Sequence, residues 1–283
     1  MTRRPPFAPF LVLALVLAAA ACGGPAGSRR PPLPEAPPVI EPVPETPVAA
    51  DEGRPGVLER LPGVDPPVRD LLVEPEGEEP APGILLVHAW WGLDPGTRDL
   101  ARDLSAAGYL VVVPDLYEQV VATSRISARE LIRGVAPDRA RELLAAGLAR
   151  LAAHPRFDGK AFALAVEQGG DFLVPFAAER AAAGAEPAFR GLVLDSTNLS
   201  LHEADLPRLG CPVLWLVGAS SAAFDAAVEQ RWKERAREGG VDLTVRLVPE
   251  AGVGLLDPRS LGYRQAARDQ ALAAILDWLR ARR

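Results

Sequence analysis

Short apolar runs alternate with amphipathic stretches from about residue 57 to the end of the chain. Apolar runs of strand length cover residues 83–90, 109–117, 160–166, 190–195, 212–218 and 242–248. Apolar residues recur at helical spacing in residues 97–108, 127–135, 138–153, 172–183, 222–239 and 263–282. Such alternation is typical of a mostly parallel sheet with helices on both faces. The pattern therefore predicts one α/β domain over residues 57–283.

The first 56 residues lack this alternation. Residues 1–22 combine two early arginines, an apolar stretch and small residues directly before Cys22. This arrangement is typical of a secretory signal that ends in a lipobox, so we expect lipidation of Cys22; an ordinary signal with an incidental cysteine is the alternative. Residues 23–56 are rich in proline, which predicts a disordered tether. Together the two segments predict a protein anchored by lipid to a membrane of the bacterial envelope, on its periplasmic or surface face.

The composition, charge and motifs of the chain argue against several kinds of ligand and partner. The net charge of −6 argues against a nucleic-acid partner. The second cysteine, Cys211, begins an apolar run and is expected to be a buried small hydrophobe. No pair of histidines or cysteines has the spacing of metal ligands, and no glycine-rich phosphate loop follows a strand. We therefore expect neither a metal nor a cofactor.

Residues 160–178 contain the most informative local pattern. An apolar run leads into the tight sequence Glu-Gln-Gly-Gly, and a helical pattern follows. Strand, sharp turn and helix make up a nucleophile elbow, which needs small residues two positions before and after its apex. Ala165 and Gly169 meet that need, but the apex is Glu167 instead of serine, cysteine or aspartate. We expect a strained backbone at Glu167, with its carboxylate turned toward the first amides of the next helix.

Several motifs resemble one known family. They are His88-Ala89-Trp90-Trp91-Gly92, Arg98-Asp99-Leu100-Ala101, Gly108-Tyr109 and Pro114-Asp115-Leu116-Tyr117. Their sequence and order resemble the dienelactone hydrolase family, and the resemblance covers nearly the whole domain. It implies an α/β-hydrolase fold and a cysteine or serine hydrolase ancestry.

The same resemblance implies a degenerate catalytic triad. The family places a nucleophile, an acid and a histidine in that order along the chain, and these positions fall on Glu167, Ser221 and Val253. A glutamate that interacts with the family's thiol is replaced by Ala89. Because covalent hydrolysis needs a nucleophile and a base within reach of each other, these replacements favour a protein without the family's activity.

Other residues near the expected site have two interpretations each. His88 ends the strand expected beside the elbow, where it could act as a substitute base or be bound by loop backbone. Trp90, Trp91 and Gln168 could line a ligand pocket, although large aromatics after a core strand usually pack. Asp225 could be a displaced acid or a helix cap.

A polar loop at residues 196–198 follows the strand that ends at Asp195, at the sheet edge where ligands bind in such folds.

Two functions remain open. The first is a membrane-tethered, inactive relative that binds a small molecule or a protein. The second is an ester or lactone hydrolase that uses a Glu167–His88 site. A purely structural protein of the envelope is a third, less favoured interpretation.

Overall fold

The computed structural model describes residues 57–60, 69–186, 188–221 and 224–283. The predicted signal peptide and tether, Cys22 included, lie outside the described residues. None of the described helices is long and apolar enough to span a membrane.

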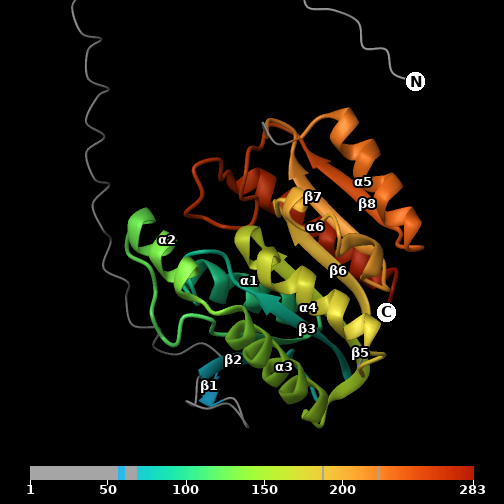
Figure 1. The fold of residues 1–283 in the computed structure, drawn as a ribbon. Coiled ribbons are helices and arrows are strands. Elements are labelled where there is room, and N and C mark those ends of the chain that lie inside the picture. Colours follow the sequence, from blue (N-terminus) through green and yellow to red (C-terminus); the bar gives the residue numbers. More distant parts are fainter. Residues whose placement is uncertain (1–56, 61–68, 187, 222–223) are drawn as a thin grey trace, which may run out of the picture. The chain divides into compact units, whose positions relative to one another are not determined.

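The described residues form an eight-stranded sheet with the strand order β1-β2-β4-β3-β5-β6-β7-β8 (Figure 1). The strands are β1 (Val57–Arg60), β2 (Arg69–Val73), β3 (Ala81–Val87), β4 (Leu110–Pro114), β5 (Phe157–Val166), β6 (Phe189–Asp195), β7 (Val213–Gly218) and β8 (Leu243–Val248). β2 pairs antiparallel with β1 and β4, and every later pair is parallel. The predicted mostly parallel sheet is confirmed.

The sequence pattern did not predict β1 and β2. They have four and five residues, so neither is long enough to show a clear alternation of apolar and polar positions. Their place in the sheet depends on pairing with β4, which lies some 40 residues further along the chain.

Six α-helices connect the strands. They are α1 (Pro95–Ala106), α2 (Arg125–Gly134), α3 (Pro137–Ala153), α4 (Gly170–Ala182), α5 (Ala226–Glu238) and α6 (Gln265–Arg280). Predicted and observed bounds differ by at most a few residues, mainly where capping side chains fix a helix start. Asp225 is such a cap, because its carboxylate accepts a hydrogen bond of 2.7 Å from the Val228 amide. The structure therefore gives Asp225 a capping role, and the alternative of a displaced acid gains no support.

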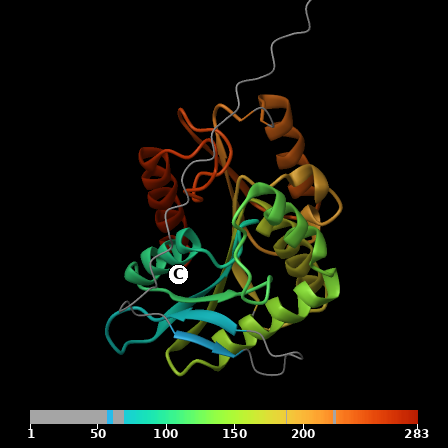
Figure 2. The same cartoon turned by 90° about the vertical axis from the view of Figure 1, so that its left-hand side faces the viewer.

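The alternating side chains of the strands divide the core between the two faces of the sheet. In β3, Leu85 and Val87 belong to the apolar cluster that also contains the buried residues of α3, α4 and α5. Ile84 and Leu86 belong to the opposite cluster, with those of α1 and α6. Figure 2 shows α6 on one side of the sheet and α3 to α5 on the other. Helices cover both faces, as predicted.

Candidate functional site

The turn between β5 and α4 has the backbone of a nucleophile elbow. Glu167 at its apex has a φ of 47°, in the left-handed region that non-glycine residues rarely adopt. A Cβ atom at Gly169 would lie 2.6 Å from the carbonyl oxygen of His88, so only glycine lets the elbow approach the end of β3. Ala165 is fully buried between the neighbouring strands. The predicted elbow and its strained apex are confirmed.

The Glu167 carboxyl is turned toward the loop between β8 and α6, residues 249–264, here called the β8–α6 loop. The side chain is 5% exposed, and Oε1 accepts a hydrogen bond from the Ser260 hydroxyl. A side chain at Gly254 would overlap the same Oε1 atom. This corrects the expectation that the carboxylate would bind the first amides of α4: in the described structure its hydrogen bond is to Ser260.

The charge state of Glu167 in this position agrees with a place away from the helix amides. Burial, together with the nearby carboxyls of Asp257 and Asp195, raises the pKa of Glu167 to about 8, although the Ser260 hydrogen bond lowers it. At neutral pH the side chain is therefore mostly a neutral carboxylic acid. A neutral group gains little from the positive end of a helix dipole.

Two further buried carboxyls make the site acidic. Asp195, at the end of β6, accepts hydrogen bonds of 3.0 Å from the Leu256 amide and from the Ser196 hydroxyl. Burial raises the pKa of Asp195 to about 7 and that of Asp257 to about 6. Asp195, Asp257 and Glu167 thus form a cluster in which each ionised member disfavours ionisation of the others.

The β8–α6 loop is held against this cluster by contacts from distant parts of the chain. The Gly254 amide donates a 3.0 Å hydrogen bond to Ser196 Oγ. The Arg259 guanidinium donates to the carbonyl of Ala122 at 2.8 Å. With the Glu167–Ser260 hydrogen bond, these contacts hold the loop against the elbow apex.

The structure brings the three residues predicted to occupy the triad positions to one edge of the sheet. Ser221 lies in the turn after β7 and is nearly buried. Val253 lies in the β8–α6 loop beside Gly254, and its side chain is 48% exposed. The two turns are joined by a 2.8 Å hydrogen bond from the Ser220 amide to the Ala251 carbonyl. The predicted positions therefore converge, but they carry neither a nucleophile of the family's kind nor a base.

His88 is bound by backbone. Its Nε2 accepts a 3.1 Å hydrogen bond from the Leu116 amide, so its Nδ1 carries the proton that is donated to the Ala89 carbonyl at 2.7 Å. Burial lowers the pKa of His88, which keeps the ring neutral. In the described structure both ring nitrogens are used in this way, and neither bonds Glu167. The Glu167–His88 arrangement thus has no hydrogen bond to support it.

The residues predicted to contact a ligand are largely buried against other side chains. Trp91 is 4% exposed, and the Arg259 guanidinium lies 3.8 Å from the centre of its ring. Trp90 is half-buried beside it, with ring centres 5.1 Å apart. The indole nitrogen of Trp90 and Oε1 of Gln168 are buried without a hydrogen bond in the described structure. The Trp91 indole lies close to the Asp257 carboxyl. Contact of these residues with a ligand remains a prediction.

The polar loop after β6 also has structural roles. The Thr197 hydroxyl donates to the backbone carbonyl of Glu167 at 3.1 Å, and the Thr197 carbonyl accepts from the Trp215 indole at 3.1 Å. The side chain of Asn198 caps a short helical turn.

Cys211 is buried, and burial raises the pKa of its thiol to about 12, as expected for an inert packing residue.

Comparison with known proteins assigns the chain to a family. The model of the dienelactone hydrolase family matches residues 68–282. This chain belongs to the dienelactone hydrolase family. A provisionally named carboxymethylenebutenolidase of Methylorubrum extorquens is 27% identical over 227 residues, which cover 77% of either chain. One of Yersinia pestis is 25% identical and covers 70% of this chain and 78% of its own.

Solved structures of this family share the fold. A provisionally named dienelactone hydrolase from Klebsiella pneumoniae has a TM-score of 0.67 and 20% identity, over 79% of this chain and 97% of its own. A dienelactone hydrolase-like promiscuous phosphotriesterase from metagenomic libraries has a TM-score of 0.68 and 19% identity, over 81% and 99%. At these identities the likeness establishes the α/β-hydrolase fold of the dienelactone hydrolases.

Sequence reasoning missed three members of the site. Asp195 was seen only as the end of a strand, and Asp257 and Ser260 follow Val253, the position predicted to correspond to the family's histidine. No local pattern marks them, because Asp195 and Ser260 meet their hydrogen-bond partners across 61 and 93 residues, and Asp257 acts through its charge on the distant carboxyls of Glu167 and Asp195. In the described residues, no group of three His, Cys, Asp or Glu side chains is arranged to hold a metal ion.

Proposed function

We propose that this member of the dienelactone hydrolase family does not hydrolyse esters or lactones by the family's reaction. In this proposal it is a membrane-tethered binding protein for a small molecule or a protein partner. The observation that carries the proposal is the state of the elbow apex. Glu167 is buried, neutral at pH 7 and hydrogen-bonded to Ser260 at the place where the family has its nucleophile.

Covalent hydrolysis needs an activated nucleophile, and the surroundings of Glu167 oppose activation. A carboxylic acid with a pKa of about 8 is only a small fraction carboxylate at pH 7, and the neutral acid is a poor nucleophile. The position of the base carries Val253, which has no titratable group. Removal of all triad functions leaves only oxyanion binding and positioning, on the order of 10³–10⁴ over water.

The alternative is an active hydrolase that uses Glu167 and His88. The hydrogen bonds of His88 to the Leu116 amide and the Ala89 carbonyl count against it, because a base needs a free nitrogen near the group it activates. An active-site rearrangement on substrate binding would have to break both bonds.

Steady-state hydrolysis of p-nitrophenyl acetate and of a dienelactone distinguishes the inactive binding protein from the hydrolase that uses Glu167 and His88. The substrates are offered to wild type, to Glu167→Gln and to Glu250→Gln, a control with the same substitution at an exposed position. We expect no turnover above the buffer rate in any of the three. A wild-type kcat above about 1 s⁻¹, ordinary for an enzyme, that Glu167→Gln abolishes and Glu250→Gln keeps would overturn the proposal and favour the alternative.

The membrane tether in this proposal is supported by sequence alone. The basic start, the apolar stretch and the small residues before Cys22 form a lipobox-like pattern, and the proline-rich residues 23–56 follow it. At about 3.1 Å per residue, an extended tether of this length could hold the domain some 100 Å from a membrane.

A further inference from the structure

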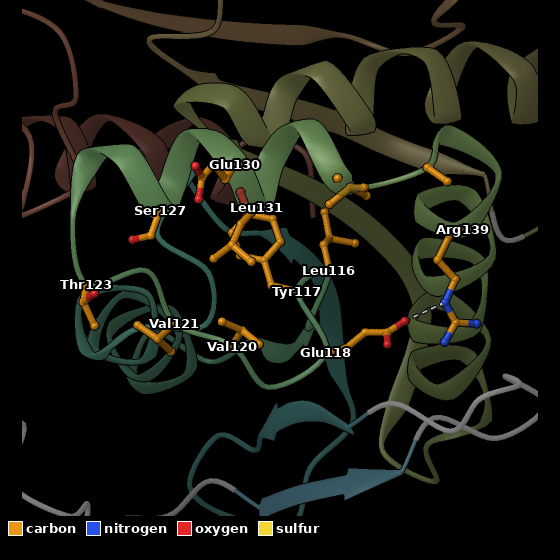
Figure 3. A pocket seen from close by; sticks show the side chains of 13 residues that line it. Leu116, Tyr117, Glu118, Val120, Val121, Thr123, Ser127, Glu130, Leu131 and Arg139 are labelled. Atoms are coloured by element: carbon orange, nitrogen blue, oxygen red, sulfur yellow. Dashed lines mark hydrogen bonds and ion pairs between the residues drawn. The ribbon is translucent and has the colours of Figure 1, made fainter.

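We propose that a groove between α2 and the segment that follows β4 binds a small amphipathic cation, an apolar body that carries an amine. The groove, here called the α2 groove, has a volume of about 630 Å³, within the range of small-molecule sites. Helix α2 forms one wall, residues 116–123 the opposite one, and the start of α3 closes one end (Figure 3). The three triad positions do not line it, so this site is independent of the elbow.

The walls of the α2 groove are mainly apolar and partly exposed. Leu116 and Leu131 line it, and Val120 and Val121 form part of the wall opposite α2 (Figure 3). Val120 is 48% exposed and Val121 is 38% exposed. A bound apolar body would remove these side chains from water, at about 25 cal/mol for each Å² buried.

The wall opposite α2 is preorganised. Glu118 and Gln119 are consecutive non-glycine residues with φ values of 53° and 77°. The Asp115 carboxylate holds this turn by accepting hydrogen bonds of 3.1 Å from the Tyr117 amide and 2.6 Å from the Gln119 amide. Strained backbone of this kind costs on the order of 1–3 kcal/mol per residue, and it persists only where surrounding contacts fix it. Because the wall is already fixed, a ligand need not order it.

The charges of the α2 groove favour a cation over an anion. The charged residues that line it are Glu118, Glu130 and Arg139, two acids and one base. Arg139 pairs with Glu118 at 3.0 Å, shown by the dashed line in Figure 3, and with Glu142 at 2.7 Å. Glu130 forms no ion pair with any residue in the part of the chain that the structure describes. The guanidinium is thus already neutralised, whereas one carboxylate is available to an ammonium group.

A hydroxyl in the α2 groove provides a second contact for an amine. Tyr117 lies in the middle of the groove (Figure 3), and its hydroxyl makes no hydrogen bond to a described residue. Burial, with Asp115 nearby, raises the pKa of Tyr117, so the phenol stays neutral and can accept from an ammonium. Its ring is fixed by an edge-to-face contact with His88, with centres 4.8 Å apart.

Two probes of matched shape and opposite charge test the proposal. Naphthylethylammonium and naphthylacetate are titrated into the full chain at pH 7 and low ionic strength, with calorimetric detection. We expect the cation to bind with a Kd on the order of 0.1–1 mM. The anion should bind at least about fivefold weaker, and the difference should shrink at high salt, because exposed charges are screened.

Variants locate the site. Glu130→Gln should remove the preference for the cation, while Glu203→Gln, the same change at an exposed position outside the groove, should keep it. Val121→Trp should fill the groove and abolish binding of both probes. Leu247→Trp, at a 41% exposed position on β8, should not.

Equal affinity for the two probes, no saturable binding below about 10 mM, or binding that survives Val121→Trp would overturn the proposal. Glu167→Gln should leave the probe affinities within twofold of the wild type. A failure of the groove proposal and a failure of the elbow proposal are therefore separate results.

Discussion

Replacement of Glu167 by glutamine should make the protein more stable at alkaline pH and leave it unchanged at acidic pH. The side chain is 5% exposed, and its pKa is raised from an ordinary 4.5 to about 8. The folded state therefore holds the proton more tightly than the unfolded state does. The protonated carboxyl makes its full contribution to the free energy of unfolding below pH 4.5. This contribution is lost as the pH rises from 4.5 through 8.

The size of the effect follows from the pKa difference. At about 1.36 kcal/mol per pKa unit, the shift of Glu167 from 4.5 to about 8 corresponds to roughly 3 to 5 kcal/mol of unfolding free energy. This is a large share of the 5 to 15 kcal/mol that a typical domain has. Glutamine cannot ionise, and its amide oxygen can still accept from the Ser260 hydroxyl.

Urea unfolding followed by tryptophan fluorescence at pH 5, 7 and 9 measures the difference between wild type and Glu167→Gln. We expect the two to be equal within about 1 kcal/mol at pH 5, and the variant to be more stable by several kcal/mol at pH 9. Glu250→Gln, at an exposed position, is the control. It should leave the free energy of unfolding unchanged at all three pH values. A stability difference between wild type and Glu167→Gln that is the same at all three pH values would refute a buried, protonated carboxyl at the apex.

Three further predictions concern the lipid anchor, the elbow and the residues at the predicted triad positions. Mass spectrometry of the N-terminal peptide from a bacterial host should find Cys22 lipidated, and an unmodified Cys22 would contradict the tether. Gly169→Ala should lower the unfolding free energy by about 2 kcal/mol or more, since its Cβ would lie 2.6 Å from the carbonyl oxygen of His88. Unchanged stability in urea would disprove the close approach. Glu167→Cys alone should not hydrolyse esters, whereas its combination with Ser221→Asp and Val253→His should give measurable turnover; activity of the single variant would show that a base is present after all.

The sequence by itself determined the features that depend on neighbouring residues. The alternation of apolar runs and helical stretches predicts the layered sheet, because side-chain periodicity is a local property. The elbow could be predicted from Ala165, Gly169 and the intervening residues, because its steric demand falls within five positions of the chain. The proposed loss of the family's nucleophile and histidine likewise rests on single positions of the sequence, Glu167 and Val253.

Only the tertiary structure decided what surrounds those positions. The carboxyl of Glu167 bonds Ser260, 93 residues away, and Asp195 bonds the amide of Leu256, 61 residues away. Whether a carboxyl is charged depends on burial and on nearby carboxyls, which are fixed when loops from separate strands meet at one edge of the sheet. The same holds for His88, whose ring nitrogens are occupied by backbone groups on two different segments. Local sequence therefore shaped the elbow, and long-range packing set its chemistry.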